Sequence, residues 1–481
     1  MAGPVFSFRD PADGCGVLDE RVLRFVTGAN VEEFQAFLQS SVSRELEQRK
    51  LLVATRPLTE PEVAELSSQP EWEAFFGRQS AARFFEHERI PFPSYPHEWP
   101  AEMLWEAARL TLEVAQRTLA EGWGLKDATP QNVLFRGSLP VFIDLLSFER
   151  RPPTDPVWRP YAQFVRTFVL PLLAHRLWGT PLSQVFLSRR DGLEPEEIYR
   201  WCHPLTRLWP TVLSLVCLPK WLSGSARREA AALYQPRETE PEKARFIVES
   251  LFGRLQRTLN RLKPCRARES VWSDYMQTHS YSGPAFAAKE RFVRDALAEL
   301  KPARVLDVGA NTGHFSVMAA EGGARVVAID IDPACVGAIW QRARAGSLDL
   351  LPLVVDLARP TPALGWQYRE SASFLDRARG ASDCVLMLAV LHHLLVTERV
   401  PLDDVLALAA ELTTDALVIE FVAPADDMFR QLTRGREHLH ASLTAEVFEA
   451  AGAKRFAVVR SVALPETHRR LYLLRKRNRS A

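Results

Sequence analysis

The most constraining feature of the chain is residues 305–316, which read Val-Leu-Asp-Val-Gly-Ala-Asn-Thr-Gly-His-Phe-Ser. A short apolar stretch runs into a turn that contains Gly309, Asn311 and Gly313, and a helical pattern then continues to the glycine pair 322–323. Glycine is needed where the backbone takes positive φ or lies against a ligand, and Asn is the next most tolerant residue. The pattern predicts a strand, a glycine turn and a helix, which is the unit that holds nucleotide-like ligands in doubly wound α/β sheets.

The next apolar stretch supports a nucleotide-like ligand. Residues 325–330 are apolar and β-branched and end in Asp330, whose carboxylate can accept both hydroxyls of a bound ribose. A dinucleotide-binding turn would read Gly-x-Gly-x-x-Gly. This turn reads Asp-x-Gly-x-Asn-x-Gly and contains Asp307, so it differs from the dinucleotide pattern.

This turn resembles motif I of the class I S-adenosylmethionine-dependent methyltransferases, and the resemblance extends over roughly residues 275–477. Further strand-like runs follow in that family's order, each with a polar residue at the expected place: 353–356 with Asp356, 383–389 followed by His392 and His393, and 416–422 with Glu420. Two late runs, 455–460 and 470–475, match the antiparallel pair that separates this family from dehydrogenases. The resemblance implies an α/β fold with a seven-stranded Rossmann-like sheet whose last strand is antiparallel.

The resemblance also implies which residues bind S-adenosylmethionine. A carboxylate at a strand end suits the ammonium group of the cofactor, and glycines let the backbone approach its methionine part. Other carboxylates take the ribose hydroxyls and the adenine amine. The predicted set is Asp307 for the ammonium; Gly309, Asn311 and Gly313 for the methionine part; Asp330, with Asp332 or the Ile331 backbone, for the ribose; Asp356 and Leu357 for the adenine; and Leu388 and Ala389 for the pocket floor.

Methyl transfer is a displacement at a sulfonium carbon. The enzyme must hold nucleophile, methyl and sulfur in line and supply a base where the nucleophile carries a proton. His392 and His393, just past the fourth strand, are the predicted bases, and His393 is preferred, since an imidazole pKa near 6.5 suits this role. The alternative is that one histidine caps the strand–helix turn. Glu420 and Glu370 are further candidates for contact with the substrate, and no metal site is predicted in this domain.

Two other segments of this domain bear on the acceptor. Residues 359–379 are an insertion between the third and fourth strands that is positioned to shape the acceptor pocket. The insertion lacks the Asn-Pro-Pro-Tyr signature of amino-methyltransferases that act on DNA bases or glutamine, which disfavours those acceptors. Tyr275, Tyr281 and Lys289 lie on a loop and helix where this fold usually places the lid over the cofactor, and the aromatic residues there belong either to the lid or to the core.

A second informative stretch lies in the first half of the chain. Asp127 and Asn132 have the spacing Asp-x4-Asn, and a strand, a turn at Gly137, a second strand and Asp144 follow. The arrangement resembles the catalytic and metal-binding loops of the protein-kinase-like fold, especially its aminoglycoside-phosphotransferase branch. The resemblance implies that Asp127 accepts the substrate proton and that Asn132 and Asp144 hold Mg²⁺ with ATP.

Three departures from that pattern leave several interpretations of the first half. The His two positions before the loop Asp is Leu125 here, no Gly-x-Gly-x-x-Gly loop is present, and Lys50 is the only candidate for the nucleotide-binding lysine. The domain is a degenerate kinase-like fold without phosphotransfer, an active kinase-like domain that uses Mg-ATP, or an unrelated helical domain. In the last case Asp127, Asn132 and Asp144 make turn and capping hydrogen bonds.

The remaining patterns of the first half predict a mainly helical α+β domain. Residues 1–20 are predicted to be loosely held, short strands are predicted at 21–26, 51–54 and 82–90, and helices at 31–38 and 101–121. Residues 234–243 are polar with two prolines and predict a linker, and a basic amphipathic helix follows at 244–263. The predicted domains are 1–235, a linker with the basic helix at 236–271, and 272–481.

The amino-acid composition limits which binding partners and which cellular compartment we expect for the chain. A net charge of +1 on 481 residues disfavours a dedicated nucleic-acid binder. Six cysteines without a Cys-x-x-Cys pair fit reduced thiols in the cytoplasm better than a zinc site or a disulfide framework. The first residues show no secretory pattern, and the apolar runs 164–173 and 212–218 are too short to span a bilayer.

The leading hypothesis is a cytoplasmic enzyme that transfers a methyl group from S-adenosylmethionine to oxygen or nitrogen of a small-molecule or saccharide-type metabolite, with the first domain binding substrate or a partner. One alternative is a phosphotransferase joined to a methyltransferase. Another is an RNA methyltransferase that uses the basic stretch 252–268. No motif identifies the methyl acceptor or the oligomeric state.

Overall fold

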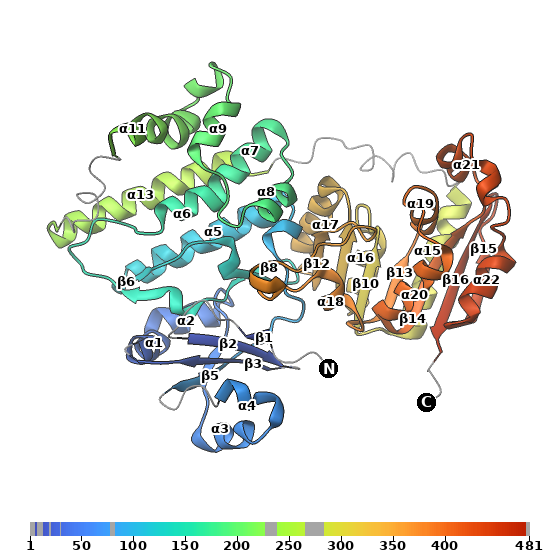
Figure 1. Ribbon diagram of the computed structural model, residues 1–481, viewed down its shortest axis with the longest axis horizontal. Coiled ribbons are helices and arrows are strands. Elements are labelled where there is room, and N and C mark those ends of the chain that lie inside the picture. Colours follow the sequence, from blue (N-terminus) through green and yellow to red (C-terminus); the bar gives the residue numbers. More distant parts are fainter. Residues whose placement is uncertain are drawn as a thin grey trace. The chain divides into compact units, whose positions relative to one another are not determined.

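The computed structural model describes residues 5–6, 13–18, 21–28, 30–76, 82–226, 238–264 and 283–477. The chain divides into two compact units (Figure 1). Unit 1 comprises Met1–His97, Ala101–Phe135 and Pro140–Pro264, and unit 2 comprises Glu98–Pro100, Arg136–Leu139 and Cys265–Ala481. The predicted lid residues Tyr275 and Tyr281 lie outside the described ranges.

A seven-stranded mixed sheet forms the centre of unit 2. Its strands are β10 Arg304–Val308, β11 Arg325–Asp330, β12 Leu350–Val354, β13 Ser382–Met387, β14 Thr413–Val422, β15 Phe456–Ala463 and β16 Arg469–Lys476. The order is β12-β11-β10-β13-β14-β16-β15; the first five strands are parallel, and β16 is antiparallel to both of its neighbours. The predicted seven-stranded sheet with an antiparallel last strand is confirmed.

Helices bury this sheet on both faces (Figure 1). They are α15 Gly283–Leu300, α16 His314–Glu321, α17 Pro333–Gly346, α18 Phe374–Ala378, α19 Leu391–Val396, α20 Leu402–Leu412, α21 Asp427–Thr433 and α22 Ala445–Ala453. Side chains of α15, α16 and α17 pack with alternate residues of the strands, among them Val326 and Ala328. The intervening Val327 and Ile329 are buried as well, as expected of parallel strands covered on both sides.

A five-stranded antiparallel sheet, in the order β1-β2-β3-β5-β4, begins unit 1. Phe34 from a neighbouring helix meets Phe85 of the sheet edge-on, with the ring centroids 4.6 Å apart, and both side chains are buried. The elements of this part are β1 Val5–Phe6, β2 Asp13–Leu18, β3 Arg21–Val26, α1 Asn30–Leu38, α2 Ser41–Gln48, β4 Thr55–Pro57, α3 Glu60–Ser67, α4 Pro70–Phe76 and β5 Arg83–His87.

The rest of unit 1 is mainly helical, with the predicted short strands around the kinase-like loop. In the described part of the chain, no helix is long and apolar enough to cross a bilayer. The elements are α5 Ala101–Leu119, β6 Trp123–Leu125, β7 Val133–Arg136, β8 Leu139–Phe142, β9 Phe148–Arg150, α6 Tyr161–Phe164, the π-helical η4 Val165–Val169, α7 Leu170–Trp178, α8 Leu182–Ser188, α9 Pro195–Trp201, the 3-10 turn η5 Thr206–Leu208, α10 Pro210–Val212, the π-helical η6 Leu213–Cys217, α11 Leu218–Ala226 and α13 Pro241–Leu262.

The prediction of a strand at residues 51–54 is wrong, because the nearest strand, β4, begins after them. The N–H groups of Leu51 and Leu52 donate to the carbonyl of Leu46 at 2.9 and 3.3 Å, so these residues complete the end of α2. Leu52 makes only an isolated parallel bridge, with Phe142, and β4 begins at Thr55. The apolar run therefore serves the helix end rather than a sheet.

The prediction that residues 1–20 are loosely held is wrong for the strand Asp13–Leu18. This strand pairs with β3 along its whole length. A Cβ at Gly14 would lie 2.4 Å from Cε1 of Phe25, so the glycine makes room for that ring. A glycine that weakens a strand pattern in the sequence is here required by packing.

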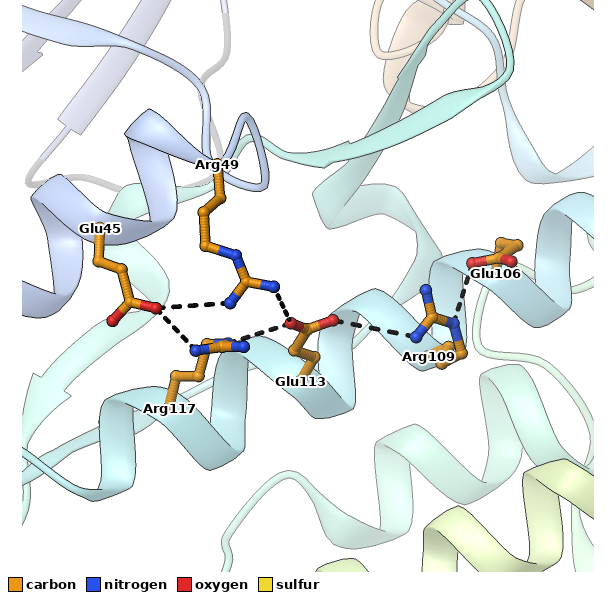
Figure 2. Close-up of polar contacts among 6 residues, drawn as sticks. All are labelled: Glu45, Arg49, Glu106, Arg109, Glu113 and Arg117. Carbon is orange, nitrogen blue, oxygen red and sulfur yellow. Dashed lines mark hydrogen bonds and ion pairs between the residues drawn. The ribbon is translucent and has the colours of Figure 1, made fainter. Parts of the chain in front are cut away.

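A network of charged side chains joins α2 to α5 (Figure 2). Glu113 accepts from Arg49 at 3.1 Å and from Arg117 at 3.0 Å, and Glu45 accepts from Arg117 at 2.7 Å and from Arg49 at 3.4 Å. Arg109, which also pairs with Glu106 at 3.1 Å, lies 4.0 Å from the second oxygen of Glu113. Glu113 is therefore the centre of the network.

We expect Glu113→Gln to loosen α2 from α5, because the amide keeps the shape of the side chain and loses the charge that three arginines face. Exposed pairs contribute up to about 1 kcal/mol each and are screened by salt. Hydrogen exchange of α2 amides should quicken about three- to fivefold at low salt, and the difference should shrink at 1 M salt. Asp427→Asn, which removes a single 3.8 Å pair with Arg430 in unit 2, is the control and should leave α2 unchanged.

Candidate active site

The predicted cofactor residues follow the carboxyl ends of the parallel strands of unit 2. Asp307 lies in β10, Asp330 ends β11, and Leu388 follows β13. Since β10 pairs with both β11 and β13, the three strand ends lie at one edge of the sheet. Asp356 follows two residues after the end of β12, because this strand covers Leu350–Val354 and lies earlier in the chain than predicted.

The glycine turn after β10 has the predicted backbone. Gly309, Asn311 and Gly313 take φ values of +67°, +51° and +79°. A Cβ at Gly309 would lie 2.1 Å from Cγ2 of Val390, and one at Gly313 would lie 2.8 Å from Cγ1 of Ile339. The two glycines are therefore required by positive φ and by close packing against the start of α19 and the middle of α17.

Asp330 is fixed between the glycine turn and the next helix. Its Oδ2 accepts from the Asn311 N–H at 2.8 Å, and its Oδ1 accepts from the Asp332 N–H at 2.9 Å. Burial raises the pKa of Asp330, while these backbone donors act in the opposite direction. Each carboxylate oxygen keeps a second lone pair, so the group can still accept from hydroxyls of a ligand.

Asp307 is a buried carboxyl group with a raised pKa. Its Oδ2 accepts from the hydroxyl of Ser316 at 2.5 Å. Burial raises the pKa of Asp307 to about 7, since the Ser316 hydrogen bond and the more distant Lys289 lower it less than burial raises it. The sequence analysis missed Ser316, although its place in the first turn of α16 follows from the predicted strand–turn–helix unit.

The outer residues of the predicted cofactor set differ in their surroundings. Asp332 caps α17, accepting from the Ala334 N–H at 2.9 Å, while Ile331 is 59% exposed beside it. Asp356 accepts from the Ala358 N–H at 2.9 Å and pairs with Arg359 at 3.1 Å. Of the remaining residues, Leu357 and Leu388 are buried and Ala389 takes a φ of +57°.

His392 and His393 lie in the first turn of α19, with ring centroids 4.2 Å apart. His392 is buried, and its Nδ1 has no hydrogen-bond partner among the described residues. Burial lowers the pKa of both histidines, with the positive charge of Arg469 as a further cause. Both imidazoles are therefore neutral at pH 7 and able to accept a proton.

A chain of buried charges lies beneath these histidines and was missed by the sequence analysis. Glu420 on β14 accepts from Nζ of Lys289 at 2.6 Å, and its other oxygen lies 3.6 Å from Nη1 of Arg469. Arg469 also donates to both oxygens of Asp426, at 2.7 and 3.1 Å. Burial lowers the pKa of Lys289 more than the Glu420 carboxylate raises it.

The remaining substrate candidate, Glu370, is engaged in its own loop. Its Oε1 accepts from the Trp366 N–H at 2.9 Å. A Cβ at Gly365 would lie 2.5 Å from the Cβ of Glu370, and the glycine has a φ of +85°. The backbone of the insertion therefore turns tightly at Gly365, and Glu370 packs against this turn.

The kinase-like residues of unit 1 form a hydrogen-bonded group. Asn132 donates to the hydroxyl of Ser147 at 3.2 Å, and that hydroxyl donates to Oδ2 of Asp144 at 2.6 Å. The other oxygen of Asp144 lies 3.5 Å from Nη1 of Arg24 on β3. Asp127 accepts from the amide of Gln163 at 3.1 Å. No group of three or more potential metal ligands occurs among the described residues.

Residues 281–459 match the family model described as a methyltransferase domain. Together with the sheet order and the strand-edge carboxylates, this match defines the class: the chain is an S-adenosylmethionine-dependent methyltransferase of class I. Nodulation protein NoeA of Rhizobium meliloti (strain 1021) is 31% identical over 471 residues, which cover 97% of this chain and 94% of that protein. The chain belongs to the NoeA family.

Solved structures give more distant similarities. The N-methyltransferase NodS from Bradyrhizobium japonicum WM9, in complex with S-adenosyl-L-homocysteine, is 16% identical and covers 43% of this chain and 93% of its own, with a TM-score of 0.32. The bifunctional kinase-methyltransferase WbdD is 16% identical and covers 42% of this chain and 41% of its own, with a TM-score of 0.29. TM-scores this low support no argument about activity.

Cofactor affinity should depend on pH through Asp307. The carboxyl group is protonated below pH 7 and ionised above it, and an ammonium group binds the ionised form. S-Adenosylmethionine should therefore bind about eight- to tenfold more weakly at pH 6 than at pH 8, because each pH unit below the pKa reduces the ionised fraction about tenfold. Isothermal titration across this range measures the effect.

Two variants make this measurement specific. Asp307→Asn should bind more weakly at pH 8 and lose most of the pH dependence. Asp330→Asn should bind more weakly at every pH and keep a pH dependence that is moved to lower pH, because the Asp330 charge helps to raise the pKa of Asp307. A wild-type affinity that is flat between pH 6 and pH 8 would show that Asp307 does not meet the ammonium group.

Proposed function

We propose that this enzyme transfers the methyl group of S-adenosylmethionine to an oxygen or nitrogen atom of a small-molecule or saccharide-type metabolite, and that unit 1 binds the substrate or a partner. The observation that carries the proposal is the pair of neutral histidines that follows β13, at the sheet edge where Asp307 and Asp330 lie. A neutral imidazole can take the proton that a hydroxyl or ammonium-type acceptor must lose.

The residues of unit 2 fit the cofactor. Two buried carboxyl groups with raised pKa values suit a ligand that brings an ammonium group and ribose hydroxyls into the same edge of the sheet. The exposed Ile331 directly after Asp330 offers an apolar surface on which the adenine ring of the cofactor can lie. Asp307, Asp330 and the turn 309–313 would hold the cofactor, which supplies an electrophilic methyl group when bound.

We assign His393 as the base that takes the proton from the methyl acceptor. His392 and Glu420 have supporting roles. His393 is the less buried of the two histidines, so an acceptor can reach it more readily. Glu420 is fully buried between Lys289 and Arg469, which favours a role in holding these cations rather than contact with the acceptor. Burial and the positive charge of Arg469 keep both imidazoles neutral, because each disfavours the protonated form.

Unit 1 is proposed to bind rather than to transfer phosphate. Asp144, the metal ligand implied by the kinase-like resemblance, faces the guanidinium of Arg24 and accepts from Ser147. A guanidinium at that carboxylate competes with Mg²⁺, so the residues as they stand do not fit a magnesium site. The five-stranded antiparallel sheet ahead of α5 keeps the degenerate kinase-like interpretation open, and it remains a proposal.

An RNA methyltransferase remains the other alternative. Arg254, Arg257 and Arg261 are exposed on α13, and their spacing places them on one side of the helix. The same arrangement is expected of any solvated basic helix face, and the net charge of +1 provides no wider basic surface. The small-molecule acceptor is therefore preferred.

His393→Gln should lower the rate of methyl transfer by a factor of about 10² to 10⁴, the usual contribution of a general base. Its affinity for S-adenosylmethionine should stay within about twofold of wild type. The measurement is transfer of labelled methyl to a panel of sugars, amines and phenols. At saturating S-adenosylmethionine, the wild-type rate should fall with acid along a limb centred below pH 6.5, because the pKa of His393 is lowered.

The variant of the neighbouring histidine separates the two roles. His392→Gln should reduce the rate less than His393→Gln does, because His392 is the more deeply buried. Full activity in His393→Gln at neutral pH would refute the assignment of the base, while loss of cofactor binding in both variants would indicate a structural role for the pair.

Titration of the full chain with Mg-ATP tests unit 1. We expect no magnesium-dependent binding, because Asp144 is engaged with Arg24. Binding of Mg-ATP that disappears in Asp144→Asn would instead support the dual enzyme. Arg24→Gln is the second variant in this titration. Removing the guanidinium should create magnesium affinity only if the rest of a metal site is present.

A further inference from the structure

The helices at the end of unit 1 expose an unusual amount of apolar surface. In the segment from α9 to α11, Ile198, Cys202, Val212, Val216 and Cys217 are buried and form the inside of a small packed group. On the outside, seven large apolar side chains are between 44% and 70% exposed: Trp201, Leu205, Leu208, Trp209, Leu218, Trp221 and Leu222. Isolated exposed leucines are normal on protein surfaces, but a contiguous set marks an interaction site.

The exposed side chains form two sets with the same spacing. Leu205, Leu208 and Trp209 are related as i, i+3 and i+4 across the turn η5, and Leu218, Trp221 and Leu222 have the same relation on α11. Residues with this spacing lie on one side of a helical segment. The α11 set therefore presents a bulky apolar ridge. Leu205, Leu208 and Trp209 form a second exposed apolar ridge around the turn η5, after which Trp209 has an extended backbone.

Contacts around Tyr199 hold the elements that carry these ridges together. The indole N–H of Trp221 lies 3.5 Å from the Tyr199 hydroxyl, and the guanidinium of Arg207 stacks 3.9 Å above the Tyr199 ring. Arg207 also donates to the Tyr199 carbonyl at 3.2 Å. Both ridges thus belong to one structural group.

The exposed apolar side chains have mainly basic neighbours. From Ile198 to Leu222 the chain carries Arg200, Arg207 and Lys220 and no Asp or Glu. Glu197, one helical turn before Trp201, is paired with Arg189. An excess of cations beside exposed leucine and tryptophan suits a layer of anionic headgroups over hydrocarbon, because cations meet the headgroups while leucine and tryptophan enter the interface.

We propose that the surface formed by Trp201, Leu205, Leu208, Trp209, Leu218, Trp221 and Leu222 binds an anionic lipid bilayer. Binding is peripheral, with apolar side chains at the level of the headgroups and Arg200, Arg207 and Lys220 against anionic lipid. A cavity of about 460 Å³ lined by Trp178, Gln184, Arg189 and Trp201 adjoins this surface. The proposal concerns unit 1 and does not depend on the methyl acceptor.

Co-sedimentation of the full chain with vesicles tests this proposal. The chain should bind vesicles of phosphatidylcholine with 30% phosphatidylglycerol at least fivefold more strongly than vesicles of phosphatidylcholine alone, and salt should weaken the binding. The combined substitution Leu208→Ser, Trp209→Ser and Leu222→Ser should reduce the bound fraction at least fivefold. Arg200→Gln with Lys220→Gln should reduce the preference for the anionic vesicles.

Matched controls remove exposed apolar groups elsewhere. Phe246→Ser on α13 and Leu439→Ser in unit 2, which are 68% and 62% exposed in the wild type, should bind vesicles as wild type does. Thermal unfolding curves of the variants that match wild type show that unit 1 is folded. S-Adenosylmethionine titration reports on unit 2, and its failure would concern the proposed function alone. Equal binding to both kinds of vesicle, or equal loss in the controls, would overturn the proposal. So would a lipid-free dimer that the triple substitution dissociates, since the surface would then bind a second copy.

Discussion

The structure of unit 2 depends on the burial of two carboxyl groups at one edge of a parallel sheet. Burying a carboxylate without a cation costs free energy, which the pKa values of Asp307 and Asp330 record by rising. Among the described residues, Asp307 receives one side-chain donor, Ser316, and Lys289, the cation that acts on it, is already paired with Glu420. The free site is therefore electrostatically incomplete, and a ligand that carries an ammonium group and hydroxyls would relieve that cost.

The turn 309–313 packs closely against the helices beside this edge of the sheet. Gly309 and Gly313 lie so close to Val390 and Ile339 that any side chain would force the helices after β11 and β13 away from the sheet. The same turn supplies the Asn311 N–H that orients Asp330. Backbone conformation, helix packing and carboxylate orientation are thus coupled, so a change at one glycine would disturb all three.

Local patterns in the sequence were enough to predict the sheet of unit 2 and the residues at its edge. Strands buried on both faces read as continuous apolar runs, and the glycine turn requires particular residues, so both leave a signal within a few positions. The pair Lys289–Glu420 leaves none, because its partners are 131 residues apart and each resembles an ordinary charged residue of a helix or a strand. Residues 51–54 were assigned wrongly for a different reason: an apolar run of four residues fits a strand, but the N–H groups of Leu51 and Leu52 donate to the carbonyl of Leu46, and the pairing of the run with Phe142 is a single bridge.

The two units also show why a motif alone does not define a ligand site. Unit 1 contains the acids and the amide of a metal-binding loop at the expected spacing, yet Asp144 faces Arg24 and Ser147, and Asn132 donates to the same serine. These groups satisfy one another, so a cation would have to displace a protein contact to bind. In unit 2 the carboxyl groups of Asp307 and Asp330 are buried with hydrogen-bond donors but no ion pair of their own among the described residues. The absence of an ion pair among the described residues, rather than the order of residue types, distinguishes these carboxyl groups from Asp144 of unit 1.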